Sequence, residues 1–79
     1  MSELDEWVAE VAAELGLGDV EVPTKAVLDV ARDVAHNVLR PGAPVSAYLL
    51  GLAVAAGADP ADAAQRISAL ALRRAAPGN

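Results

Sequence analysis

The chain has 79 residues, a net charge of −5 and no cysteine, which excludes a disulfide framework, a cysteine-ligated metal site and a two-domain enzyme. Its apolar residues include 19 Ala but only 21 Leu, Val or Ile, and no Phe, so large core side chains are scarce. A chain this short also buries a smaller fraction of its surface than a larger domain does. The composition therefore predicts a fold that is marginally stable or assisted by a partner.

The acidic residues are concentrated at the start of the chain. Residues 1–22 contain seven acids and no Lys or Arg, whereas residues 23–79 contain four acids and all six bases. This distribution argues against nucleic-acid binding, which requires clustered Lys and Arg. The acidic start is unlike a secretory signal peptide, and two Pro and three Gly interrupt the longest uncharged run, residues 41–58. We expect a cytoplasmic protein that does not span a membrane.

An amphipathic helix is predicted over residues 3–15, with Ser2 as its N-cap and Gly16 as its stop. Apolar side chains at helical spacing form one face: Leu4, Trp7, Val8, Val11, Ala12 and Leu15. Four acids form the opposite face: Glu3, Glu6, Glu10 and Glu14.

A second helix is predicted over residues 24–39, after a loop at residues 16–23. Thr24 is its expected cap, and Pro41 ends it because the residue before a proline is disfavoured in a helix. Its apolar side chains cover about half of the helical wheel, so this helix should contact more than one neighbour.

A third helix is predicted over residues 44–56, with Pro44 at its first position and Gly57 after its end. Large apolar side chains point in every direction around it: Val45, Tyr48, Leu49, Leu50, Leu52 and Val54. A helix without a polar face is expected in the interior of a protein. Small residues also recur at every fourth position, which gives a strip where another backbone can approach closely: Ala47, Gly51 and Ala55.

The fourth predicted helix opens with Asp59 as the cap and Pro60 at the first position, and it extends to about Arg74. Residues 75–79 are expected to be a disordered tail. The predicted fold class is thus all-α: a compact four-helix bundle with a central apolar third helix, forming a single domain over residues 1–74. Three short neighbours are too few to cover the third helix fully, so we expect a homodimer or a docked partner.

Asp29, Asp33 and His36 lie on one helical stripe, and carboxylate and imidazole groups are ligands of several divalent metal ions. Arg32 and Arg40 flank this stripe and repel a cation, and the chain has no second His, so we interpret it as a solvated helix face. Neither a nucleophile elbow nor a glycine-rich phosphate loop is present in the sequence. No catalytic residue, metal or cofactor is therefore predicted.

An anion site is a further hypothesis, built from His36, Arg40 and Ser46. Arg40 supplies a fixed cation, and the third helix is expected to begin nearby with unpaired N–H groups at Val45, Ser46 and Ala47. In the alternative interpretation, Arg40 hydrogen-bonds the last carbonyls of its own helix and Ser46 only supports the first turn of the next.

Several strings of this sequence look familiar, and the most specific is Ala-His-x-Val-x-Arg-Pro-x-Ala-Pro at residues 35–44. The others are residues 28–36, Leu4-Asp5-Glu6-Trp7 and Leu50-Gly51-Leu52-Ala53. On these strings the sequence resembles, over about residues 4–72, a small helical family of unknown activity from high-GC bacteria. Members of that family occur alone or as a C-terminal extension of the molybdenum cofactor guanylyltransferase, which joins molybdopterin to a guanine nucleotide.

Three hypotheses about function follow. The resemblance implies a non-enzymatic accessory or docking module of molybdenum cofactor biosynthesis, whose partner is the molybdenum cofactor guanylyltransferase. The second hypothesis is a module that binds a phosphorylated pterin or a nucleotide at the anion site. The third is a helical protein that associates with itself and binds no ligand.

Overall fold

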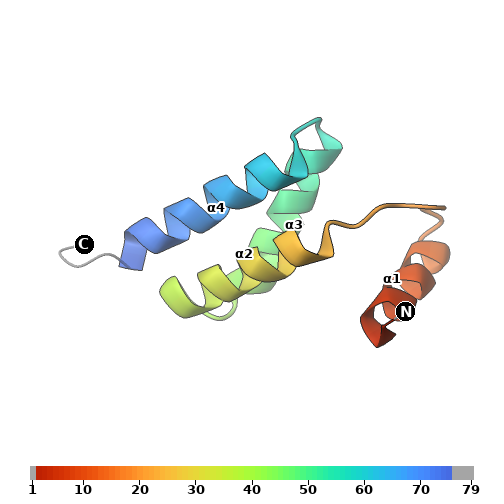
Figure 1. The fold of residues 1–79 in the computed structure, drawn as a ribbon, viewed down its shortest axis with the longest axis horizontal. Helices are drawn as coiled ribbons and strands as arrows, with labels where there is room; N and C mark the ends of the chain where they lie inside the picture. Colours follow the sequence, from red (N-terminus) through yellow and green to blue (C-terminus); the bar gives the residue numbers. More distant parts are fainter. Residues whose placement is uncertain (1, 76–79) are drawn as a thin grey trace.

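The computed structural model describes residues 2–75, and four α-helices confirm the all-α fold class (Figure 1). Their bounds are α1 (Glu3–Glu14), α2 (Thr24–Asn37), α3 (Gly42–Ala55) and α4 (Pro60–Ala75). No strand occurs within these residues. Ala75, which we expected in a disordered tail, is the last residue of α4. The same expectation for residues 76–79 lies outside the described part of the chain.

Two of the predicted caps are confirmed by their hydrogen bonds. The Asp5 amide donates to Ser2 Oγ at 3.1 Å, and the Asp62 amide donates to Asp59 Oδ2 at 2.9 Å. Each bond satisfies one of the amides that a helix start leaves without an intrahelical partner. Gly16 ends the α1 region with a φ of +68°, a left-handed conformation that favours glycine. Local sequence chemistry thus determines the start of α1 and α4.

The cap predicted at Thr24 is wrong. Pro23 occupies the N-cap position of α2, and Thr24 is already the first helical residue. The Thr24 hydroxyl donates to the Val22 carbonyl at 3.4 Å instead of accepting from an amide of the helix. A nearby backbone carbonyl therefore competes successfully for this short polar side chain.

The α2–α3 junction also differs from the prediction. Helix α2 ends at Asn37, whose side-chain amide donates to the Asp33 carbonyl at 2.8 Å. Helix α3 begins at Gly42, so Pro44 is its third residue and not its first. Helix α2 ends earlier than predicted because the Asn37 side chain caps it. Helix α3 begins earlier than predicted because amides of the turn hydrogen-bond to carbonyls within the same turn. The Gly42 amide donates to the Leu39 carbonyl at 3.0 Å.

Helices α2, α3 and α4 form the packed body of the protein. Helices α2 and α4 lie side by side and run in the same direction (Figure 1). Helix α3 connects the end of α2 to the start of α4 and runs back along the body (Figure 1). Apart from Leu50, the buried core consists of valines and alanines: Val30, Val34, Leu50, Ala63, Ala64 and Ala71. The alanines of α4 allow its backbone to approach α2 closely, which is how an alanine-rich chain builds a dense interior.

Helix α1 stands apart from this body. No Cα atom of α1 lies within 8 Å of a residue in α2, α3 or α4. It packs instead on the linker that follows it, and Ala12 is the one α1 residue buried there. The separation makes the molecule elongated, with extents of 46 × 27 × 19 Å (Figure 1).

Candidate functional site

The structure does not join the predicted anion-site residues. His36 is exposed near the end of α2, Arg40 is exposed in the turn, and Ser46 is half-buried on α3. Within residues 2–75, no side-chain hydrogen bond or ion pair involves any of the three. They lie close together along the chain, but no interaction fixes them as one site.

The amides that this anion site relied on are placed differently from the prediction. Because α3 begins at Gly42, the Ser46 amide lies opposite the Gly42 carbonyl, the regular α-helical pairing. The Gly42 and Ala43 amides donate to carbonyls of the preceding turn, each at 3.0 Å. Pro44 has no amide hydrogen. The first turn of α3 therefore offers few free donors, and the anion site stays a prediction.

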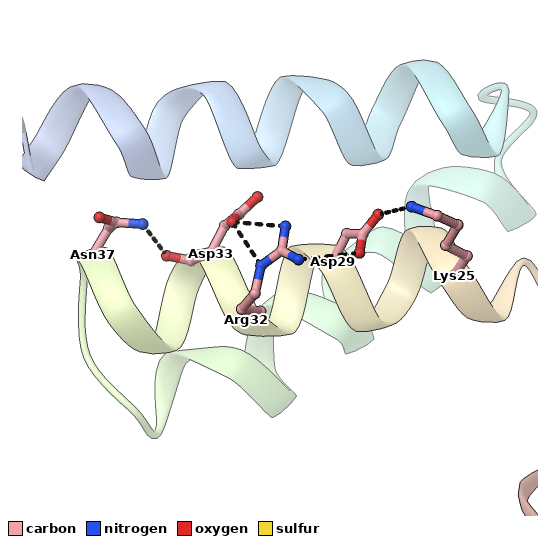
Figure 2. Close-up of polar contacts among 5 residues, drawn as sticks. All are labelled: Lys25, Asp29, Arg32, Asp33 and Asn37. Carbon is pink, nitrogen blue, oxygen red and sulfur yellow. Dashed lines mark hydrogen bonds and ion pairs between the residues drawn. The ribbon is translucent and has the colours of Figure 1, made fainter.

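The side of α2 that faces α4 carries a row of charged and polar side chains (Figure 2). Lys25 Nζ lies 2.7 Å from Asp29 Oδ2, and Arg32 reaches Asp29 at 3.6 Å and Asp33 at 3.3 Å. This row borders an open hollow of about 480 Å³ between α2 and α4. The two carboxylates are paired with cations of their own helix, which leaves the row electrically balanced.

This pairing bears on the metal hypothesis that the sequence raised. Asp29 and Asp33 share Arg32, which repels a metal ion placed between them. Within residues 2–75, no three side chains among His, Cys, Asp and Glu gather closely enough to hold a metal. We interpret the row as a surface ion-pair network, in which each exposed pair contributes little to stability.

The Lys25–Asp29 pair gives a testable prediction about acid titration. The hydrogen bond from Lys25 holds the pKa of the Asp29 carboxyl below its ordinary value, against the opposing effect of partial desolvation, and the charges of Lys25 and Arg32 add to the lowering. Because the folded pKa is the lower one, the stabilisation is present above the unfolded value of about 3.9 and is lost as the pH falls through the folded value. We expect Lys25→Met to raise the Asp29 pKa in an NMR titration of carboxyl carbons.

Lys25→Arg is the matched control, since it keeps a cation and a donor at the same position. We expect it to preserve a lowered Asp29 pKa. An equal Asp29 pKa in the native chain and in Lys25→Met would show that the ion pair does not persist in solution.

The outward side of α3 is the largest departure from the sequence-based expectation. Only Leu50 of α3 is buried, so the prediction of an interior third helix is not met within a single chain. Four large apolar side chains at i, i+3, i+4 and i+7 are exposed, and we call them the α3 stripe: Val45, Tyr48, Leu49 and Leu52. Tyr48 is 70% exposed. The body consists of three helices, so α2 and α4 cover one side of α3 only.

The strip of small residues on α3 is exposed in the single chain at Gly51 and Ala55, while Ala47 is half-buried. A Cβ atom built on Gly51 would meet no atom within 4 Å. No backbone therefore approaches this position among the described residues. Because Val45, Tyr48 and Leu52 lie on the side of α3 away from Leu50, they present one continuous apolar surface to the surroundings.

Helix α1 presents a second apolar surface. Its inner side packs on linker residues Leu17, Val20 and Val22, around a hollow of about 260 Å³. Its other side leaves Trp7 and Leu15 exposed, at 61% and 65%. The sequence predicted the amphipathic pattern of α1 correctly, but the pattern does not indicate that the body leaves this helix uncovered.

The sequence signal for these surfaces was present but ambiguous. A helix that is apolar all round has no polar face from which its outward side can be recognised. The i, i+3, i+4, i+7 spacing of the α3 stripe becomes visible only once Leu50 is known to point inward. None of the described helices combines the length and hydropathy that crossing a membrane requires.

These features define a small all-α protein with exposed apolar helix surfaces. The chain belongs to the family described as a domain of unknown function (DUF6457), whose model matches residues 1–79. Comparisons with curated proteins and with solved structures find no match.

Proposed function

We propose that this protein is a docking module, which acts by binding another protein through the α3 stripe. The observation that supports this function is the exposure of four large apolar side chains on one side of α3. Monomeric proteins rarely expose contiguous apolar patches of this kind unless the patch binds something. Tyr48 lies within the stripe, and tyrosine is among the residues enriched at interface hot spots.

The chemistry of the stripe favours a protein partner over a charged small ligand. Helix α3 contains no charged residue, so it offers an anion or a cation no counter-charge. Large apolar side chains on a rigid helix suit a complementary apolar groove or helix of a partner. Since Leu50 and Val54 of the same helix pack into the core, the stripe is held in place by the body.

The proposed partner is the molybdenum cofactor guanylyltransferase, and this part of the proposal depends on the sequence resemblance at residues 35–44. In this interpretation, the chain contributes binding and positioning, while the enzyme performs nucleotidyl transfer. The turn at Arg40 and Pro41, which carries the resemblance, joins α2 to α3 and so sets the direction of the stripe.

The test is isothermal titration calorimetry of the chain with the molybdenum cofactor guanylyltransferase from the same organism. We expect saturable binding by the native chain and at least tenfold weaker binding by Tyr48→Glu/Leu52→Glu, because two charges are placed in the apolar contact. Leu28→Glu/Leu72→Glu is the matched control, since it adds the same charge at two exposed apolar positions outside the stripe.

The outcomes separate the two parts of the proposal. Absence of binding by the folded native chain would rule out this enzyme as the partner. Binding that both double variants weaken equally, or that neither weakens, would show that docking does not use the α3 stripe. Circular dichroism of each variant verifies that the helices remain folded.

A further inference from the structure

The exposed side of α1 combines aromatic, aliphatic and acidic side chains, and we call it the α1 patch. Its residues surround a hollow of about 230 Å³ and recur at helical spacing: Trp7, Glu10, Val11, Glu14 and Leu15. Trp7 and Leu15 project from its two ends, while Glu10 and Glu14 lie along one border. Helix α1 carries five acids and no base, so the patch is strongly negative.

A surface of opposite character lies on α4, and we call it the α4 groove. It is a hollow of about 400 Å³ with a lining of two arginines and three apolar residues: Arg66, Ile67, Ala69, Leu70 and Arg73. Leu70 is exposed between the two arginines. The ion pairs found within residues 2–75 all lie on α2 and leave both arginines unused.

The two surfaces are complementary in charge, although their charged residues are spaced differently. Along a helix, Glu10 and Glu14 are about 6 Å apart and Arg66 and Arg73 about 10.5 Å apart, distances that the long arginine side chains can bridge. Leu70 then meets the apolar part of the α1 patch, and a guanidinium can stack on the Trp7 ring. We propose that the α1 patch of one copy packs into the α4 groove of a second copy, and that the exchange is reciprocal.

Charge selects this pairing over other arrangements of two copies. Two α1 helices brought together would oppose five acids with five acids. The α3 stripe lacks charged residues and offers Glu10 and Glu14 no cation. The α4 groove supplies apolar contact together with two arginines that take part in none of the ion pairs found within residues 2–75, and it leaves the α3 stripe free for the partner proposed above.

The structure of the linker favours a second copy over the same chain. Leu17, Val20 and Val22 line a hollow together with the inner side of α1, and the Leu17 amide donates to the Ala12 carbonyl at 2.9 Å, so the linker of nine residues is not a free tether. For α1 to reach the outer side of its own α4, these contacts must break. In a dimer they are retained, and a two-fold axis makes each copy both donor and acceptor of α1.

Sedimentation equilibrium of the full chain tests the dimer, combined with the fluorescence of Trp7, the single tryptophan. We expect a monomer–dimer equilibrium that weakens with salt, and a blue shift of Trp7 emission that follows dimer formation. Glu10→Arg/Glu14→Arg and, separately, Arg66→Glu/Arg73→Glu should each raise the dissociation constant at least tenfold, because like charges then face each other. Asp19→Arg/Glu21→Arg, the same charge change in the linker, should leave the constant within about threefold.

Mixing the two charge-reversed variants distinguishes exchange between copies from contact within a chain. In a mixed dimer, the basic α1 of one variant faces the acidic α4 of the other, and the second interface is complementary as well. We expect each variant alone to be monomeric and the mixture to form a heterodimer. A native chain that remains monomeric, or variants whose mixture stays monomeric, would overturn the proposal, and a Trp7 blue shift independent of concentration would assign the contact to α1 and α4 of one chain.

Discussion

Leu50→Ala is expected to lower the free energy of unfolding by about 3 kcal/mol, within the range of about 2–5 kcal/mol for truncating a buried leucine. Leu50 is 2% exposed and is the one α3 side chain that is fully buried in the core formed with α2 and α4. Its remaining neighbours are mostly valines and alanines, which cannot extend into the space left behind. For a domain of this size the total stability is about 4–12 kcal/mol, so the variant should be close to unfolding.

Urea denaturation followed by far-UV circular dichroism measures this loss. Trp7 fluorescence does not serve here, because Trp7 lies on α1 away from the core. Leu49→Ala is the matched control: it removes the same atoms from the same helix, but Leu49 is 55% exposed, and its effect should stay within about 0.5 kcal/mol. Comparable destabilisation by both variants would contradict the conclusion that Leu50 points into the core and Leu49 does not.

Gly42→Ala is expected to destabilise the fold by about 1–2 kcal/mol, although alanine is the better helix former. A Cβ atom at Gly42 would lie 2.9 Å from Val34 Cγ1, a distance that real Cβ contacts essentially never show. Val34 is buried, and its β-branched side chain has little freedom to rotate away. The methyl group must therefore push α3 away from α2 at the point where the two helices approach.

Gly51→Ala provides the control for Gly42→Ala within the same helix. A Cβ atom at Gly51 would meet nothing within 4 Å, so only the helix-propensity gain remains, about 0.5–1 kcal/mol of added stability. The double variant Val34→Ala/Gly42→Ala should lose less stability than the sum of its two single changes, since removing the valine methyl groups relieves the clash. Strict additivity in these urea melts would sink the steric explanation.

The helices themselves were largely predictable from local chemistry. Ser2 and Asp59 cap their helices as predicted, and Gly16 and Gly57 follow the ends of α1 and α3 with positive φ angles. The errors lie at Thr24 and at the start of α3, where several neighbouring groups compete for the same hydrogen bonds. Such competition is settled by the backbone geometry of the turn, which one-dimensional spacing does not contain.

The candidate surfaces depended on packing to a greater extent. The sequence identified α3 as apolar on all sides and predicted that a second copy or a partner covers part of it. It did not indicate which side of α3 faces outward. It also predicted His36, Arg40 and Ser46 from their proximity along the chain, whereas the structure shows no contact that assembles them. The anion site therefore stays a prediction.

What the sequence determined by itself was the helical content, most helix ends and the acidic character of α1, because these follow from interactions between residues a few positions apart. The tertiary structure alone decided that Leu50 points inward, that the α3 stripe points outward and that α1 lies apart from the body. These outcomes depend on how three helices divide a small set of valines and alanines between them. Which side chains are buried therefore depends on all three helices at once, because core side chains that cover one helix are not available to cover another.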